Sequence, residues 1–276
     1  MRFGEADYRL LSRRTVKDNP ANHMVGKDNN AVDPLSVRRR LIVNADDFGQ
    51  SPGVNRGIIK AHEHGIVSST SMMVRWPASA DAAQYARTHP RLSVGLHLDL
   101  GEWIYRDDGW VCLYEVAALA DGDAVAAAIA SQLQAFRDLI GRDPTHLDSH
   151  QHVHRDDPLR TIVINLGRKI GVPVRHFHDQ IRYSGNFYGQ TGKGSPFPAG
   201  ISVNHLVDTI AALCPGVTEL GCHPGLGVDV ESMYRDERAI EVETLCDPRV
   251  RQSIDDNSIE LCGFDSFRTN AKTYLA

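Results

Sequence analysis

Short apolar runs alternate with longer helical stretches along this chain, from residue 41 to residue 264. Short apolar runs bounded by turn residues are typical of buried strands, whereas longer stretches with a period of about 3.6 residues are typical of helices. On this basis we predict strands at residues 41–45, 66–74, 92–100, 172–176, 217–222 and 259–264, and one more in the histidine-rich segment that follows Pro144. We predict helices at residues 52–64, 77–88, 123–140, 158–170, 202–213 and 232–246.

The alternation of strands and helices is typical of a parallel sheet. Two features favour closure of that sheet into a barrel. The predicted strands are apolar on both faces, and polar residues stand at the C-terminal ends of several of them. No G-x-G-x-x-G motif follows the first strand, so a dinucleotide-binding fold has no local support. We therefore predict a (β/α) barrel of about seven parallel strands.

The first 40 residues differ from the rest, because they are polar, rich in Arg, Asn and Asp, and without a clear hydrophobic period. We predict that residues 1–40 form a flexible or loosely docked N-terminal extension. A length of 276 residues fits one large domain, and we assign residues 41–276 to a single barrel. Residues 177–200 are rich in Gly, Ser and Pro, and we predict that they form a lid or substrate loop.

Composition indicates an ordinary soluble globular protein, with 42% hydrophobic residues, 24% charged residues and a formal net charge of −5. Nothing in this balance indicates a nucleic-acid partner. The chain contains neither a membrane span of about 18 consecutive apolar residues nor the apolar region of a signal peptide. The five cysteines are scattered and form no C-x-x-C pair, which argues against disulfides and against a thiolate zinc site. We therefore predict a cytoplasmic protein.

Histidine and aspartate stand at the ends of several predicted strands. Four histidines fall within residues 146–154, and the pair Asp46-Asp47 ends the first strand. His97 lies late in the third strand, His150 ends the histidine-rich strand, and His223 follows the strand at 217–222. Imidazole nitrogens and carboxylate oxygens are the ligands that zinc and other first-row divalent ions accept. The pattern predicts a metal site at the C-terminal face of the barrel.

Each cluster also has a simpler interpretation. The histidine-rich segment could be a polar, solvated turn, although every second residue of a strand shares one face, so that His146, Asp148 and His150 would point together. The pair Asp46-Asp47 could be a helix N-cap and its neighbour. Against that interpretation, Ser51 directly precedes a proline and is the better N-cap.

Four separated segments resemble the YdjC-like carbohydrate deacetylases, a family that includes chitooligosaccharide deacetylases. The matching segments are IVNADDFG at 42–49, GLH at 95–97, THLDSH at 145–150 with the trailing His152 and His154, and CHP at 222–224. The resemblance runs in order from about Leu41 to Phe264, and residues 1–40 lie outside it. It implies a distorted, polysaccharide-deacetylase-like (β/α) barrel that uses a divalent metal ion to hydrolyse an N-acetyl group on an amino sugar. By the same resemblance, Asp47, His97 and His150 are the metal ligands and Asp46 is the catalytic base.

The chemistry of amide hydrolysis agrees with this assignment. A divalent ion such as Mg²⁺ or Zn²⁺ acidifies bound water and polarises the carbonyl, and three protein ligands leave a position open for that water. The carboxylate of Asp46 can accept the water's proton. The leaving amine needs a proton, and we predict that His223 supplies it. The argument is that a late strand of a closed barrel lies across the mouth from the first.

Further residues are assigned more loosely. Asp148 either orients a ligand imidazole or is a turn carboxylate, and His152 is either a further ligand or a surface residue. Sugars offer apolar faces to aromatic rings, so Trp76, Phe187 and Tyr188 are candidates for substrate binding, with core packing as the alternative. Arg175, in the strand predicted at 172–176, is also assigned to substrate binding.

Three functions compete at this stage. The first is a metal-dependent N-deacetylase acting on an acetylated amino sugar or short oligosaccharide. The second is another barrel metallohydrolase, such as a phosphoesterase or an amidohydrolase, although amidohydrolases place H-x-H where this chain has Asp46-Asp47. The third is a non-catalytic protein that binds sugar or metal. The sequence leaves the substrate, the native ion and assembly into a homo-oligomer open.

Overall fold

The computed structural model describes residues 38–227 and 229–267. Most of the predicted N-terminal extension, residues 1–37, therefore lies outside the described residues. The first strand, β1 (Arg39–Phe48), begins inside the predicted extension, so Arg39 and Arg40 already belong to the folded domain. Among the described residues, no helix combines the length and the apolar character that crossing a bilayer requires.

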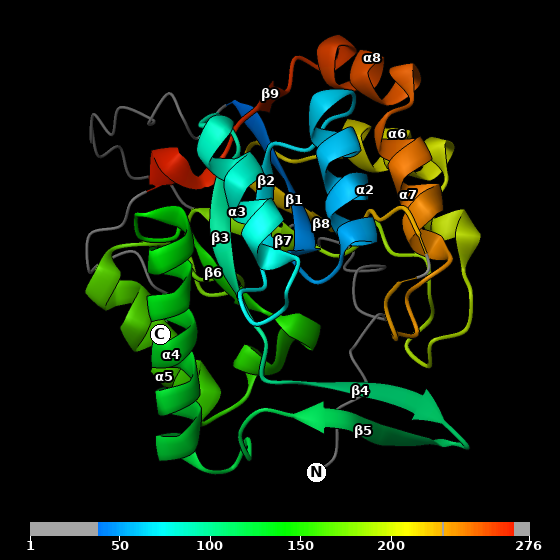
Figure 1. Cartoon of the computed structure of the whole chain (residues 1–276). Coiled ribbons are helices and arrows are strands. Elements are labelled where there is room, and N and C mark those ends of the chain that lie inside the picture. The colour runs from blue at the N-terminus through cyan, green and yellow to red at the C-terminus, as the bar shows by residue number, and fades with distance from the viewer. Residues whose placement is uncertain (1–37, 228, 268–276) are drawn as a thin grey trace, which may run out of the picture.

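A curled parallel sheet forms the centre of the molecule (Figure 1). Six strands follow the order β6-β3-β2-β1-β8-β7, and β9 pairs with the start of β1. The strands after β1 are β2 (Ser69–Met72), β3 (Ser93–Leu98), β6 (Leu147–Ser149), β7 (Ile181–Ser184), β8 (Gly216–Cys222) and β9 (Glu260–Leu261). The predicted distorted barrel of about seven parallel strands is confirmed, in the form of a half-barrel with helices around it.

Helices connect most of the strands and pack around the sheet (Figure 1). They are α2 (Pro52–Glu63), α3 (Ser79–Thr88), α4 (Gly122–Ile140), α5 (Leu159–Ile170), α6 (Val203–Ala211), α7 (Glu237–Leu245) and α8 (Pro248–Asp256), with short 3₁₀ turns η1 (His150–Arg155), η2 (Pro198–Ile201) and η3 (Phe264–Phe267). Ser51 caps α2 as predicted, because its hydroxyl accepts a hydrogen bond from the Val54 amide at 3.0 Å. The helix predicted at 232–246 begins only at Glu237, and α8 was not predicted.

Two strand predictions were wrong. Residues 172–176 form no full strand; only an isolated bridge between Val174 and Leu147 continues the sheet there, and the chain enters β7 seven residues after Val174, at the opposite edge. The antiparallel hairpin of β4 (Gly101–Arg106) and β5 (Gly109–Glu115) was not predicted at all. The sequence does carry hairpin signals, because the turn residues DDG at 107–109 lie between the apolar runs WIY at 103–105 and WVCLY at 110–114, although most of β5 is exposed. Figure 1 shows the hairpin beside the ends of the central strands.

The two faces of β1 pack against different surroundings. Leu41, Val43 and Ala45 belong to the large apolar core of the domain. Ile42, on the other face, belongs to a small cluster that Phe264 and Phe267 of η3 complete at one end of the half-barrel. Above Ile42 the same face continues with buried polar side chains, because residues two apart share a face. The apolar end therefore closes the half-barrel, and the polar end leads toward the C-terminal ends of the strands.

Candidate metal centre and catalytic residues

The end of β1 turns two adjacent carboxylates toward one site. Side chains of neighbouring residues in a regular strand point to opposite faces. In β1 the pairing with β2 shifts register between Ala45 and Phe48, and Asp47 adopts a left-handed backbone with φ 72°. Few residues other than glycine adopt this conformation, and it is often found where function requires it. Both Asp46 and Asp47 are buried, and each has a histidine within ion-pair distance.

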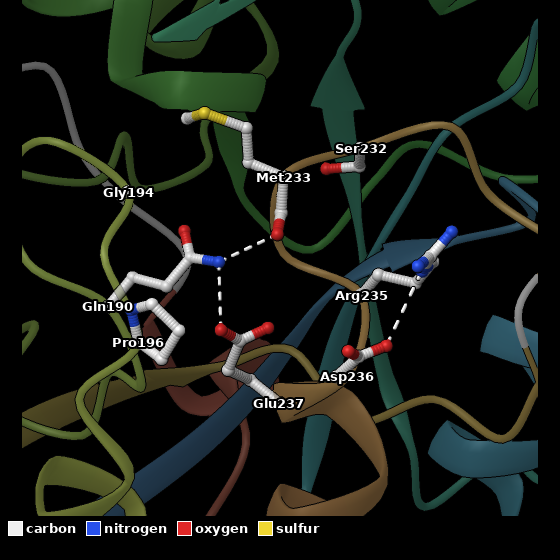
Figure 2. Close-up of a pocket in the computed structure, with 8 residues that line it drawn as sticks. All are labelled: Gln190, Gly194, Pro196, Ser232, Met233, Arg235, Asp236 and Glu237. Carbon is white, nitrogen blue, oxygen red and sulfur yellow. Dashed lines mark hydrogen bonds and ion pairs between the residues drawn. The ribbon is translucent and has the colours of Figure 1, made fainter. Parts of the chain in front are cut away.

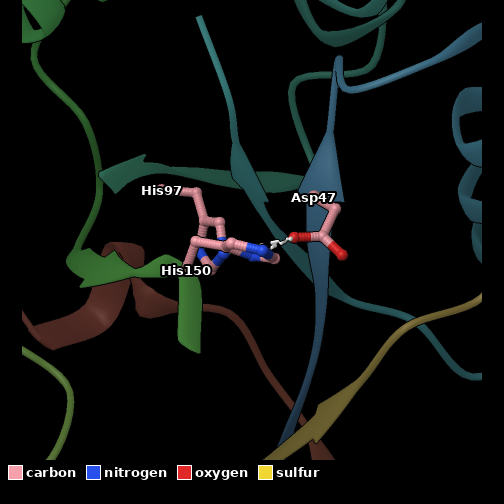
Figure 3. Close-up of side chains that lie close together, drawn as sticks. All are labelled: Asp47, His97 and His150. Carbon is pink, nitrogen blue, oxygen red and sulfur yellow. Dashed lines mark hydrogen bonds and ion pairs between the residues drawn. The ribbon is translucent and has the colours of Figure 1, made fainter. Parts of the chain in front are cut away.

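Two imidazole nitrogens converge on a single oxygen of Asp47 (Figure 3). Asp47 Oδ1 lies 3.3 Å from Nε2 of His97 and 3.2 Å from Nδ1 of His150. These three residues come from β1, β3 and the start of η1, and they form a group whose ligand atoms all lie within 4.8 Å of one another. One carboxylate and two imidazoles are a donor set that first-row divalent ions accept. The residues present therefore fit a divalent metal ion.

Asp148 fixes the orientation of one of these imidazoles. Its Oδ1 lies 2.8 Å from Nδ1 of His97, on the opposite side of the ring from Asp47. Coulombic attraction to Arg175 and His97 outweighs the effect of burial and holds the pKa of Asp148 well below its usual range, so this carboxylate accepts the Nδ1 proton. A neutral imidazole held in this way presents a lone pair on Nε2. Of the two alternatives for Asp148, the structure places it on the imidazole.

A buried arginine neutralises the neighbouring carboxylates. The guanidinium group of Arg175 contacts both oxygens of Asp46 at 2.7 and 2.8 Å, Asp148 at 2.8 Å and Glu219 at 2.7 Å. The Arg175 side chain is 0% exposed, and none of its surface remains for a substrate. The prediction that Arg175 binds substrate is therefore corrected, because its charge is used inside the protein. Burial in turn raises the pKa of Glu219 to about 7.

The position of Arg175 also distinguishes between two candidate metal sites. Asp46, His97 and Asp148 form a second group with metal-ligand spacing. However, the guanidinium group already bonds both carboxylates of that group, so a cation of the protein occupies the place. The group around Asp47 is the better candidate for an external ion.

A second arginine holds the other oxygen of Asp47. Arg238 of α7 donates from Nη2 to Asp47 Oδ2 at 2.7 Å, and both side chains are buried. Burial would raise the pKa of Asp47, but Arg238 together with the bonds from His97 and His150 holds this pKa well below its usual range. Arg238 was not predicted from the sequence, because an arginine in a helix is usually solvated.

Carboxylates outnumber guanidinium groups in the buried cluster around Asp47. Four carboxylates and two guanidinium groups lie together here: Asp46, Asp47, Asp148, Glu219, Arg175 and Arg238. The nearby carboxylates outweigh the effect of burial and raise the pKa of both His97 and His150. A divalent ion beside Asp47 would supply the positive charge that protons on these two imidazoles supply without it.

His223 lies beside Asp46 rather than across the mouth of the barrel. Strand β8, which His223 follows, pairs directly with β1, and Nε2 of His223 is 3.8 Å from Asp46 Oδ2. The positional argument for His223 was therefore wrong. Its ring packs near Tyr188 and Tyr234, with ring centroids 5.5 and 5.2 Å away. Burial lowers the pKa of His223 to about 4.

Two other histidines of the 146–154 segment are buried inside the protein and satisfied by it. His146 Nε2 contacts the Ser71 hydroxyl at 3.0 Å, and its ring stacks on Phe264. His154 bonds the Ser149 hydroxyl at 2.6 Å through Nδ1 and the Arg175 carbonyl at 3.1 Å through Nε2. These contacts explain the richness in histidine without a second ion.

His152 lies outside both groups with metal-ligand spacing. Its ring is half-buried next to His176, with centroids 5.1 Å apart, and Nε2 lies 3.4 Å from the Tyr183 hydroxyl. The backbone explains this placement, because η1 interrupts the strand at His150 and His152 has φ 55°. His152 is therefore turned away from the direction that a continuous strand would give it.

The three aromatic residues proposed to bind substrate differ in burial: one lies in the core, and two are half-buried near the surface. Phe187 is 1% exposed and belongs to the large core, which corrects its assignment to substrate binding. Tyr188 is half-buried and stacks on Tyr234 with centroids 4.6 Å apart, next to the ring of His223. Trp76 is also half-buried, and its indole N–H donates to Asp99 at 3.1 Å.

A cavity lies between residues 190–196 and residues 232–237. It measures about 290 Å³ and is lined by Gln190, Gly194, Pro196, Ser232, Met233, Arg235, Asp236 and Glu237 (Figure 2). Ser232 also hydrogen-bonds the buried carboxylate of Glu102, which lies 3.8 Å from Nε2 of His150. Glu102 was not predicted from the sequence, because residues 101–106 were not predicted to form a strand.

The chain is similar in sequence to a described family and to proteins with names that state an activity. The chain matches the family described as YdjC-like protein over residues 40–256. A chitooligosaccharide deacetylase of Salmonella schwarzengrund is 31% identical over 245 residues, which cover 79% of this chain and 95% of that protein. The Salmonella enteritidis chitooligosaccharide deacetylase has the same identity and coverage.

Two solved structures have the same fold. A putative cellobiose-phosphate cleavage protein from Enterococcus faecalis has a TM-score of 0.69 at 26% identity, over 84% of this chain and all of that one. A peptidoglycan N-acetylglucosamine deacetylase has a TM-score of 0.53 at 11% identity, over 86% of this chain and 91% of that one, and shows the likeness of fold alone. The polysaccharide-deacetylase-like fold is thereby confirmed. Since the family match spans most of the sequence, the chain belongs to the YdjC-like protein family.

Proposed function

We propose that this protein is a metal-dependent carbohydrate N-deacetylase, which hydrolyses the N-acetyl group of an acetylated amino sugar or short oligosaccharide and releases acetate. The observation that carries the proposal is the convergence of His97 Nε2 and His150 Nδ1 on one oxygen of Asp47, directly beside Asp46. The similarity to chitooligosaccharide deacetylases supports an acetylated amino-sugar substrate.

The donor set favours Zn²⁺ over Mg²⁺. Imidazole nitrogen suits zinc, whereas magnesium prefers oxygen ligands and keeps much of its water. Asp47, His97 and His150 would hold the ion, with Asp148 orienting His97. When bound, the ion would acidify a water molecule and polarise the amide carbonyl.

Asp46 is the proposed general base. Its Oδ1 accepts hydrogen bonds from Arg175 and from Asn44 at 2.8 Å, and its Oδ2 accepts one from Arg175. A carboxylate has about four acceptor positions, so one position on Oδ2 stays free to take a proton from water. Arg175 and Asn44 act as positioning residues, because they hold this carboxylate in one orientation.

His223 is the proposed donor of the proton that the leaving amine requires. Its Nε2 lies near Oδ2, the oxygen of Asp46 that keeps a free acceptor position. We infer that the proton removed by Asp46 passes to His223, which delivers it to the amine as the C–N bond breaks. The proposed base, Asp46, and the proposed acid, His223, are thus neighbours that carry the same proton one after the other.

The rim and the cavity offer places for sugar rings. Tyr188 packs beside His223 and exposes part of its ring, so it can contact the sugar whose acetamide is cleaved. The cavity beside Ser232 lies at the small end of the usual range for ligand pockets and is lined mainly by hydrogen-bonding side chains. It has room for one neighbouring sugar unit, which favours short oligosaccharides as substrates.

The decisive experiment is to incubate the Zn²⁺-loaded protein with N-acetylated mono-, di- and oligosaccharides and to measure acetate. We expect acetate release that a chelator stops and that added Zn²⁺ restores. Turnover of a phosphate monoester without acetate release would favour the phosphoesterase alternative. Sugar binding without turnover of either kind would favour a non-catalytic protein.

A further inference from the structure

One nitrogen of the proposed ligand His150 has no hydrogen-bond partner. Nδ1 faces Asp47, whereas the buried Nε2 has no such bond among the residues that the structure describes. Buried polar atoms almost always have a partner, because an unpaired one has lost its hydrogen bonds to water without replacing them. Because this nitrogen belongs to a proposed metal ligand, we expect a nearby group to accept its hydrogen bond when a metal ion is bound.

Glu102 faces that nitrogen. Its Oε2 lies 3.8 Å from His150 Nε2, and the two side chains are 3% and 10% exposed. This separation is a charged contact and is longer than a hydrogen bond. Ser232 donates a hydrogen bond to the same carboxylate and so limits the directions in which it can turn.

Hydrogen bonds join the β4–β5 hairpin to η1 next to Glu102 and His150. Gln151, which follows His150, accepts a hydrogen bond from the backbone N–H of Trp103 at 3.0 Å and donates one to the carbonyl of Trp103 at 2.7 Å. Trp103 in turn follows Glu102 in β4. These two hydrogen bonds hold the backbone of Trp103 next to Gln151, and they therefore keep the preceding residues, Glu102 and His150, close to each other.

We propose that Glu102 is a positioning residue that accepts the Nε2 proton of His150 and thereby directs the lone pair of Nδ1 toward the metal ion. The inference rests on the proposed metal site. Histidines that bind metals commonly donate their other N–H to a carboxylate, which fixes the tautomer and the ring orientation. Asp148 contacts His97 in the corresponding way, so both ligand imidazoles would have a carboxylate behind them.

The test compares Glu102→Ala, Glu102→Gln and a control, Glu115→Gln, on the exposed strand β5 of the same hairpin. Zn²⁺ affinity is measured by calorimetry, and the tautomer of His150 by the ¹⁵N shifts of its ring. We expect Glu102→Ala to weaken Zn²⁺ binding about 10–100-fold. Glu102→Gln should lose less, because the amide oxygen still accepts the Nε2 proton, and Glu115→Gln should bind as the wild type does.

The outcomes separate this inference from the proposed function. If the wild type binds no Zn²⁺, the metal site itself is wrong. If the wild type binds Zn²⁺ and Glu102→Ala binds equally well with an unchanged tautomer, the role of Glu102 is refuted while the metal site stands. If Glu102→Gln loses as much as Glu102→Ala, Glu102 is a direct ligand and the positioning role is refuted. Thermal unfolding without metal verifies that each variant is folded, and Glu102→Gln preserves the shape of the side chain if Glu102→Ala does not fold.

Discussion

Asp46 and Asp47 are adjacent, both buried and each paired with one arginine, yet their oxygens are used differently. Arg175 contacts both oxygens of Asp46, whereas Arg238 contacts only Oδ2 of Asp47. The remaining oxygen of Asp47 faces the imidazoles of His97 and His150. The comparison teaches that the arginines select which of two neighbouring carboxylates can accept an external cation.

The same contrast extends to the surroundings of each aspartate. Around Asp46 the positive charge comes from the protein itself, through Arg175, and two further carboxylates share it. Around Asp47 the donors are imidazoles, which can give up their protons and become metal ligands. His97 joins the two regions, because its Nδ1 faces Asp148 and its Nε2 faces Asp47.

The largest expected effect comes from exchanging each aspartate for asparagine. Asp46→Asn should keep the metal ion and lower kcat by about two to four orders of magnitude, the usual contribution of a positioned base. Asp47→Asn should lose the ion together with activity, because it removes the charged ligand. Elemental analysis and acetate release measure the two effects. Loss of metal from Asp46→Asn would show that the two roles have been exchanged.

The arginines offer a second way to test the comparison. Arg175→Met and Arg238→Met each leave a buried carboxylate without its partner, and we expect each to lower the free energy of unfolding by about 3–5 kcal/mol. Zn²⁺ should restore part of this loss in Arg238→Met, because an ion beside Asp47 supplies positive charge there. It should restore little in Arg175→Met. Equal recovery in both, seen in thermal unfolding with and without Zn²⁺, would contradict the separation of the two regions.

His223 tests whether the base and the acid work as neighbours. His223→Ala should keep Zn²⁺ and lower kcat for the amide by about 100-fold, within the range of a positioned acid. The loss should be much smaller for an activated acetate ester, whose leaving group needs no proton. Equal losses on amide and ester would show that His223 does something other than protonate the amine.

The location of the candidate metal site could be predicted from the sequence, because its members stand at or near the ends of strands. Asp47, His97 and His150 lie at or near the C-terminal ends of three strands, and parallel strands bring such ends together. The choice of these three residues as the ligands came from the resemblance to the YdjC-like deacetylases. The position of His223 could not be predicted in this way. Strand order depends on pairing between residues far apart in the chain, and β8 lies directly beside β1.

The supporting residues were harder to predict, since their roles depend on packing. Arg238 becomes important only because α7 packs against α2 and η2, where this side chain reaches Asp47, and nothing local distinguishes it from a solvated arginine. Glu102 depends on the hairpin, which the turn residues Asp108-Gly109 between two apolar runs could have indicated, and on the contact of that hairpin with η1, which they could not. Arg175 was singled out but given the wrong partner, because burial of its whole side chain is not visible in a sequence.

The smallest expected effect concerns Asp148, which belongs to both regions. It accepts the Nδ1 proton of His97 and also pairs with Arg175. Asp148→Asn keeps an oxygen for His97 but removes the charge that favours the correct tautomer, so we expect Zn²⁺ affinity to fall by less than the loss of about 10–100-fold that follows complete removal of such a partner. Stability should fall less than in Arg175→Met, because Arg175 keeps Asp46 and Glu219 as partners. Calorimetry with Zn²⁺ and denaturant unfolding measure the two quantities. If Zn²⁺ affinity is unchanged while stability falls, Asp148 serves only the arginine, and the two regions are independent rather than joined through His97.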